Sequence, residues 1–76
     1  MSGQLVYVNP FERLGELLSD LRRSLVAELP ANAYTGQLLG TLAGLITQAE
    51  HLRVMVATLE RHDPVAFEVF QRVVTR

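Results

Sequence analysis

Two histidines are the first residues to consider for chemistry in this chain. His51 and His62 are eleven residues apart, which on a helix corresponds to about 16 Å along the axis. That separation is too long for a shared metal ion, because zinc-binding histidines on one helix lie a single turn apart and need a third ligand. The sequence therefore predicts structural or solvent-exposed roles for both histidines.

The four ionisable residues from Glu60 to Asp63 could perform acid–base chemistry only if a cleft buried them. Asp63 precedes Pro64, and an acidic cap followed by proline is typical of a helix start. The serine and threonine hydroxyls have no histidine base at a recognisable spacing. These observations predict a solvated helix end. They also predict a protein that is not an enzyme and that uses no metal, cofactor or small-molecule substrate.

Glycines recur at every fourth position in the run TGQLLGTLAGLI, residues 35–46. A Walker phosphate loop ends in Gly-Lys-Ser/Thr, and this chain has no lysine. A dinucleotide-binding fingerprint needs a different spacing after a strand. A membrane-dimer motif needs about 20 apolar residues, far more than Leu38 to Ile46. The remaining interpretation is a soluble helix whose small residues allow another backbone to approach closely.

The composition narrows the classes of partner. The net charge is −1 and all seven basic residues are arginine, so the basic excess typical of a nucleic-acid-binding protein is missing. There is no cysteine, which excludes disulfides and zinc–thiolate sites. With 49% hydrophobic residues in 76 positions and no signal-peptide or membrane-span pattern, we expect a cytoplasmic protein. Its apolar surplus predicts self-association or burial against a partner.

Three helices are predicted to position these residues in one small all-α domain. Asn9 and Pro10 mark the start of the first helix, about 10–29, whose apolar residues are spaced three and four apart and which ends before Pro30. The second helix, about 33–62, could be capped by Asn32 or by Thr35.

Asp63 and Pro64 begin the third helix, which covers about 64–75. Residues 1–8 contain a β-prone stretch at their end. They are predicted to form an extended arm that packs on the body of the domain or pairs as a strand with another chain.

The second helix carries a heptad seam with alternating steps of four and three residues, which is typical of a helix in a bundle. The seam consists of Leu38, Leu42, Leu45, Ala49, Leu52, Val56 and Leu59. Together with Gly36, Gly40 and Gly44, it forms the predicted helix-packing or dimer interface. Two interpretations of the glycines stay open: the first helix crosses them, or they meet their counterparts in a second copy.

The candidate partner-binding residues lie elsewhere on the chain. They are Arg22 and Arg23 on the first helix and Phe67 and Phe70 on the third, because arginine and large aromatic residues are favoured interface anchors. The alternatives are that the phenylalanines close the small core and that the arginines belong to a solvated face.

Residues 10–62 resemble the small all-helical quorum-sensing antiactivators. The resemblance is carried by RRSLVAELP at 22–30, TGQ at 35–37 and QAEHLRVMVATL at 48–59. It implies a protein that binds an autoinducer-responsive transcription factor and prevents it from reading DNA. The layout is also similar to the helical-hairpin co-chaperones of type III secretion needle subunits, which grip another helical protein. The third helix and the arm depart from the antiactivator pattern.

These observations predict an antiparallel helical hairpin with a short C-terminal helix that dimerises into a helical bundle. The predicted function is a small regulatory protein that binds and inhibits or sequesters another protein, such as a transcription regulator. The alternative is a structural or co-chaperone subunit of a larger assembly such as a secretion system. DNA binding and enzymatic activity are the weaker alternatives, and DNA binding would show affinity that falls steeply with salt.

Overall fold

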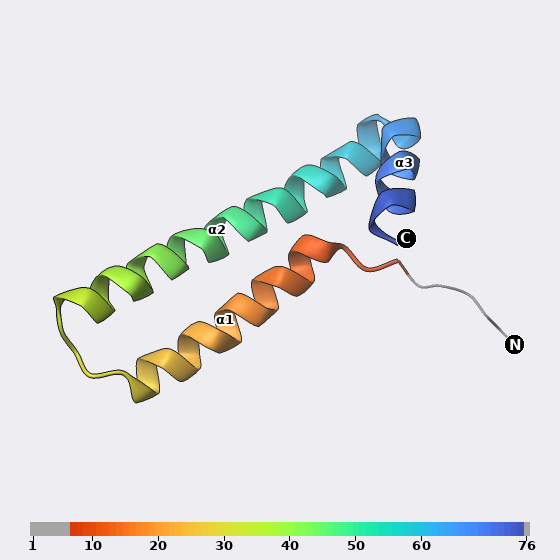
Figure 1. Cartoon of the computed structure of the whole chain (residues 1–76). Helices are drawn as coiled ribbons and strands as arrows, with labels where there is room; N and C mark the ends of the chain where they lie inside the picture. Colours follow the sequence, from red (N-terminus) through yellow and green to blue (C-terminus); the bar gives the residue numbers. More distant parts are fainter. Residues whose placement is uncertain (1–6, 76) are drawn as a thin grey trace, which may run out of the picture.

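The computed structural model describes residues 7–75, and its regular structure there is entirely helical (Figure 1). Helix α1 spans Pro10–Glu28, α2 spans Ala33–His62 and α3 spans Pro64–Val74. The predicted all-α class is confirmed, and the predicted boundaries agree with the structure to within a residue. Most of the predicted extended arm, residues 1–6, lies outside the described residues.

Side-chain caps set where each helix begins. The Asn9 side chain accepts a hydrogen bond from the Phe11 N–H at 3.0 Å, and Pro10 occupies the first turn of α1. Asn32 accepts from the N–H of Tyr34 at 2.9 Å and of Thr35 at 3.0 Å. The Asn32 N–H in turn donates to Thr35 Oγ1 at 3.0 Å. This reciprocal capping box makes Asn32 the cap of α2 and Thr35 its third residue.

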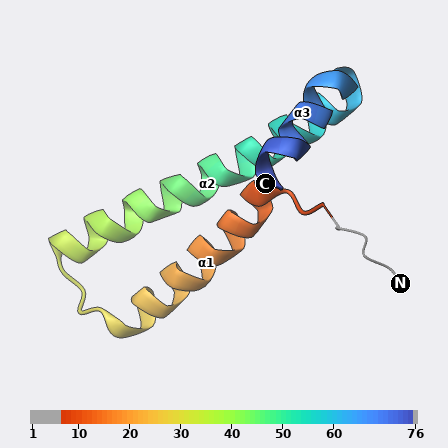
Figure 2. The same cartoon turned by 45° about the vertical axis from the view of Figure 1, so that its right-hand side comes forward.

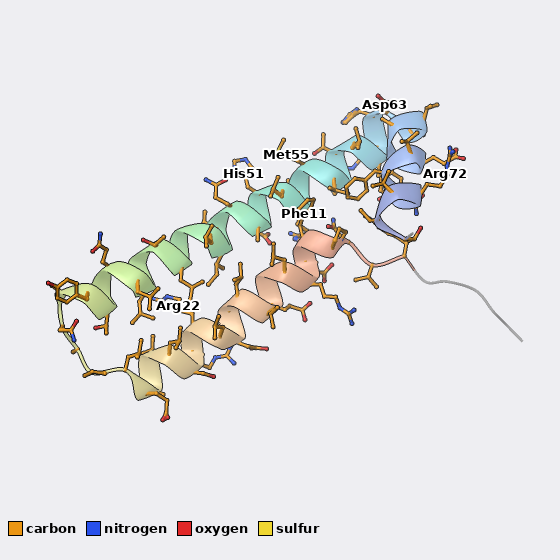
Figure 3. All side chains as sticks on the ribbon, in the orientation of Figure 1. Phe11, Arg22, His51, Met55, Asp63 and Arg72 are labelled. Atoms are coloured by element: carbon orange, nitrogen blue, oxygen red, sulfur yellow. The ribbon has the colours of Figure 1, made fainter. Side chains whose placement is uncertain are left out.

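Helices α1 and α2 run antiparallel beside each other, as both views of the chain show (Figures 1 and 2). The Asn9 side-chain amide donates to the Arg53 carbonyl oxygen at 3.3 Å. Near the other end, Arg22 Nε donates to the Leu39 carbonyl oxygen at 3.3 Å, and Figure 3 shows Arg22 between the helices. These contacts fix the register of the pair.

The interior of this pair is thin. Three α2 residues spaced seven apart, Leu42, Ala49 and Val56, are buried. From α1 they meet a half-buried stripe of Phe11, Gly15, Leu18 and Leu25. A methyl group on Gly15 would lie 3.8 Å from the Ala49 Cβ, an ordinary van der Waals distance. Within residues 7–75, Phe67 of α3 is the fourth and last buried hydrophobic side chain.

Helix α3 folds back from the end of α2 toward the start of α1 (Figure 2). Its aromatic residues close this end of the molecule. Phe67 meets Tyr7 edge-to-face with ring centroids 5.5 Å apart, and Phe70 lies 6.3 Å from Phe11. The prediction that Phe67 is an exposed partner anchor is therefore wrong for this conformation, because the ring already fills the core. The alternative interpretation, that the phenylalanines close the core, fits the structure.

Candidate protein-binding surface

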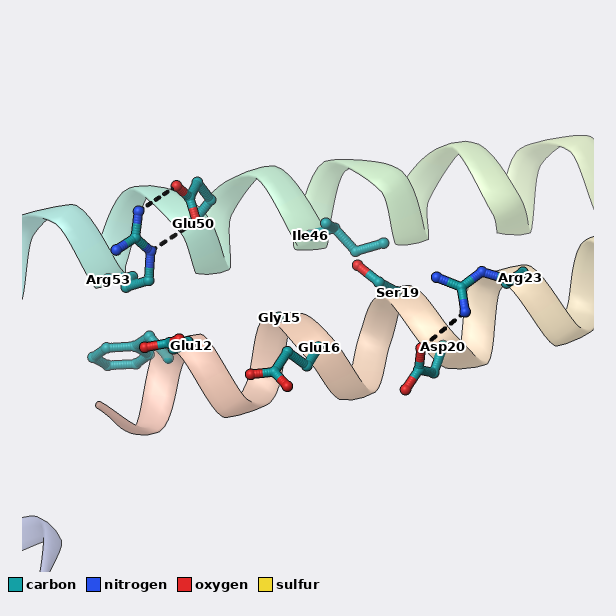
Figure 4. A pocket seen from close by; sticks show the side chains of 10 residues that line it. Glu12, Gly15, Glu16, Ser19, Asp20, Arg23, Ile46, Glu50 and Arg53 are labelled. Carbon is teal, nitrogen blue, oxygen red and sulfur yellow. Dashed lines mark hydrogen bonds and ion pairs between the residues drawn. The ribbon is translucent and has the colours of Figure 1, made fainter. Parts of the chain in front are cut away.

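One face of the α1–α2 pair is charged and slightly hollowed (Figure 4). The hollow, of about 530 Å³, is lined by Phe11, Glu12, Gly15, Glu16, Ser19, Asp20, Arg23, Ile46, Glu50 and Arg53. Asp20 pairs with Arg23 at 3.2 Å, and Glu50 pairs with Arg53 at 2.6 Å. Hydrogen bonds from the Arg53 guanidinium hold the pKa of Glu50 below its usual range.

The charged side chains of this face lie in contact with water. The side chains of Asp20, Arg23 and Glu50 are exposed, and exposed ion pairs between near neighbours on a helix contribute little to stability. The arrangement is that of a solvated surface, because no group in it is held buried and unpaired for chemistry.

The opposite face of the same two helices is apolar. On α1, Leu14, Leu17 and Leu21 lie on the other side of the buried stripe from Ser19 and Arg23. On α2, Leu38, Leu45 and Leu52 lie on the other side from Ile46 and Glu50, given about 100° of turn per residue. The residues that line the charged hollow come from both helices and share one face. The six leucines therefore share the other face.

We call this surface, Leu14, Leu17, Leu21, Leu38, Leu45 and Leu52, the apolar face. Its leucines are 38–66% exposed. Their neighbours on the same side of α2 are the uncharged Thr41, Gln48 and Met55. Among the residues of α1 and α2, Glu28 in the last turn of α1 is the charged residue closest to this side.

The apolar face has a distinctive feature near each end of α2. At the start, Tyr34 is 84% exposed. Near the end, a hollow of about 270 Å³ is lined by Met55, Thr58, Leu59, His62 and Asp63. Met55 projects from α2 away from α1 (Figure 3). We call this second hollow the corner hollow, because it lies where α2 turns into α3.

The residues of the predicted heptad seam occupy two different environments in the structure. Its members Leu42, Ala49 and Val56 face α1 and are buried, whereas Leu38, Leu45 and Leu52 flank that contact and are exposed. Leu59 is half-buried. A seven-residue repeat thus supplies both the intrachain contact and half of the apolar face.

The three glycines lie on the side of α2 that points away from α1. On the helical wheel Gly40 lies opposite Ala49, and Gly36 and Gly44 lie on either side of Gly40. A Cβ at any of the three would have no described atom within 4 Å outside its own helix backbone. The interpretation that α1 crosses the glycines is therefore wrong, and the glycine that lies at the contact between α1 and α2 is Gly15.

The two candidate arginines have different surroundings. Arg22 is half-buried and donates to a backbone carbonyl of α2, so it holds the helix pair together. Arg23 is exposed and paired with Asp20. Phe70, the remaining candidate, is half-buried in the aromatic cluster. None of these side chains belongs to the apolar face.

The sequence interpretation missed two features of the surface. The first is the exposure of Leu14, Leu17 and Leu21. The apolar stripe of α1 is too wide for one partner helix, and this width is the signal for a second contact. The second is the exposed Tyr34 in the first turn of α2.

No family model, curated protein or solved structure matches the chain. Within residues 7–75, no three acidic or histidine side chains gather closely enough to hold a metal ion. In the same part of the chain, no helix combines the length and the apolar character needed to cross a membrane.

Proposed function

We propose that the chain is a small, non-enzymatic regulatory protein of the cytoplasm that binds another protein and inhibits or sequesters it. In this proposal the α1–α2 hairpin acts through the apolar face and forms a homodimer as a helical bundle. The observation that carries the proposal is a face with six partly exposed leucines on a layer of helices that has no second layer. Helices with an apolar stripe are stable when a second layer buries it.

The six leucines supply a large part of the energy that specific binding needs. Burying a leucine completely stabilises by about 1.5–3 kcal/mol, so the half still exposed on each is worth about 1 kcal/mol. Six leucines then supply about 6 kcal/mol before polar contacts, and association consumes part of that gain. A micromolar complex needs about 8 kcal/mol net, so the partner must cover the whole face and add apolar and polar contacts of its own.

The chemistry of the face indicates what kind of partner it fits. It is uncharged along most of its length, flat and two helices wide, which suits the apolar side of another helix or helix pair. The resemblance to antiactivators suggests a transcription regulator as that partner.

Affinity capture with matched variants tests this proposal. We expect wild-type protein to retain one specific protein from the extract of its own cell, and Leu17→Glu to retain at least tenfold less. Glu16→Gln is the matched control, because Glu16 is the neighbouring residue on the charged face. Equal capture by all three proteins, or no specific capture by any, would contradict the proposal.

A co-chaperone subunit of a larger assembly is the second candidate. It is favoured by the thin interior, in which four hydrophobic side chains are buried among residues 7–75. A co-chaperone would melt without cooperativity until its client is added, whereas the regulator should show a cooperative thermal transition alone. Circular dichroism of the purified chain separates the two.

A further inference from the structure

We infer that two copies dock apolar face to apolar face, with Tyr34 of each copy inserted in the corner hollow of the other. The two-fold axis crosses α2 at Leu45 and α1 between Leu17 and Leu18, and each helix lies antiparallel to its counterpart. The inference rests on the homodimer in the proposed function and names the occupant of the apolar face. Three observations carry it.

The first observation is the spacing along α2. Leu38 lies seven residues before Leu45, and Leu52 lies seven residues after it. A two-fold axis at Leu45 therefore places Leu45 against its counterpart and Leu38 against Leu52. Such self-complementary pairing is what an isologous interface requires.

The second observation is that α1 has the same centre. Leu14 and Leu21 lie three residues before and four residues after Leu17. Gly15 is level with Ala49, and Arg22 is level with Leu39, so Leu45 is level with residues 17–18. One axis thus pairs the leucines of both helices at once.

The third observation is the match between the two ends of α2. Tyr34 lies eleven residues before Leu45, and the corner hollow is lined from Met55 to Asp63, ten or more residues after it. The same axis places Tyr34 opposite Val56, between Met55 and Leu59. An exposed tyrosine and an apolar hollow therefore meet without any shift in register.

Charge and area are consistent with a second copy as the occupant. The apolar face is uncharged along most of its length, so two copies meet without like-charge repulsion. A face two helices wide and as long as α1 covers about 600 Å² at ordinary helix dimensions. The additional length of α2 brings this near the ~800 Å² per partner of a stable interface.

The inference also assigns a role to self-association. The homodimer occupies the surface on which the protein partner of the proposed function would dock. A partner helix therefore exchanges with the second copy.

Engineered cysteines test the arrangement, since the chain has no natural cysteine. Under mild oxidation we expect Leu45→Cys to cross-link to itself, because its Cβ lies near the axis and a disulfide needs Cβ atoms about 3.8 Å apart. A mixture of Tyr34→Cys and Met55→Cys should cross-link far more than either variant alone. Gly40→Cys, on the far side of α2, is the control that should remain monomeric on a non-reducing gel.

Two results would overturn the inference. Cross-linking of Tyr34→Cys to itself would show the two α2 helices parallel. Cross-linking of Leu45→Cys to Leu17→Cys in place of Leu45→Cys to itself would show α2 lying over the partner's α1. As a second measurement, Tyr34→Ala should weaken dimerisation at least tenfold in sedimentation equilibrium, and an unchanged dissociation constant would contradict insertion in the corner hollow.

These experiments use this chain alone. Cross-links without capture of any other protein would refute the proposed function and leave the dimer standing. Capture of another protein without the expected cross-links would refute the dimer and leave the proposed function standing.

Discussion

The stability cost of a glycine at position 40 indicates whether that side of α2 is covered within one copy. An interior helical glycine costs about 0.5–1 kcal/mol relative to alanine. At Gly15 a Cβ would lie 3.8 Å from the Ala49 Cβ, in ordinary van der Waals contact, whereas at Gly40 a Cβ would have no described atom within 4 Å beyond its own helix backbone. Within one copy, no contact therefore offsets the stability cost of the glycine at position 40.

Gly40→Ala is therefore expected to stabilise the protein by about 0.5–1 kcal/mol, a rise of roughly 4 °C in Tm. The dimer should persist, because Gly40 lies away from the apolar face. Thermal melting at fixed protein concentration, together with light scattering, measures both effects. Loss of the dimer in Gly40→Ala would show that the glycines form the interface and would contradict the account. Gly15→Leu, in contrast, should lower the Tm because it forces α1 and α2 apart.

Tyr7 is the second residue whose surroundings make a prediction. Burial, and then the negative charge of Glu60, raise the pKa of Tyr7 above its ordinary value of 10.0. The folded state therefore retains a proton that the unfolded state loses, so stability should fall as pH rises above about 10. Absorbance titration of Tyr34→Phe, in which Tyr7 is the one remaining tyrosine, should give a midpoint above 10.0. A midpoint at or below that value would contradict the burial of Tyr7.

The Tyr7 hydroxyl is covered and has no hydrogen-bond partner within residues 7–75. Replacing an unpaired buried hydroxyl with an apolar group of the same shape is nearly neutral or stabilising. Tyr7→Phe should therefore leave the free energy of unfolding unchanged or raise it by up to ~1 kcal/mol at pH 7. Urea denaturation measures this, and a clear loss of stability would show that the hydroxyl has a partner.

At the level of elements, the caps explain where the helices begin. Asn32 accepts hydrogen bonds from two backbone N–H groups and Asp63 accepts one from Ala66 at 3.1 Å. Each satisfies donors that the first turn of a helix cannot pair internally. The connection between α1 and α2 is held in the same way, because Thr35 Oγ1 donates to the Pro30 carbonyl oxygen at 2.7 Å.

Asn32→Ala should destabilise the protein by about 1 kcal/mol, because it removes the acceptor for both N–H groups at the start of α2. Asn32→Asp retains an acceptor in the same position and should cost much less. Chemical denaturation of the two variants at equal concentration makes the comparison. Equal stability of Asn32→Ala and wild type would show that the capping box is not formed in solution.

The helix boundaries could be predicted because their signals are local. Asn9 with Pro10, and Asp63 with Pro64, set backbone conformations within one turn and need no knowledge of the rest of the chain. The side of each helix that faces its partner could not be predicted in the same way. The stripes on both helices are wider than one contact, and only the register fixed by Gly15, Arg22 and Asn9 decides which leucines are buried.

The whole molecule is a layer of two helices closed at one end by α3. Such a layer has two faces, and their chemistry differs. One carries ion-paired charges and suits water, whereas the other carries six leucines and suits a second layer. Two copies joined through the apolar face would form a four-helix core with charges outside.

The molar mass in solution tests this account most directly. Light scattering at micromolar concentrations should give twice 8.5 kDa for wild type and for the charged-face control Glu16→Gln. Leu45→Glu should give 8.5 kDa while remaining helical by circular dichroism, because it would bury two like charges at the axis. A wild-type mass of one chain, or a Leu45→Glu protein that stays dimeric, would contradict the claim that the apolar face joins two copies.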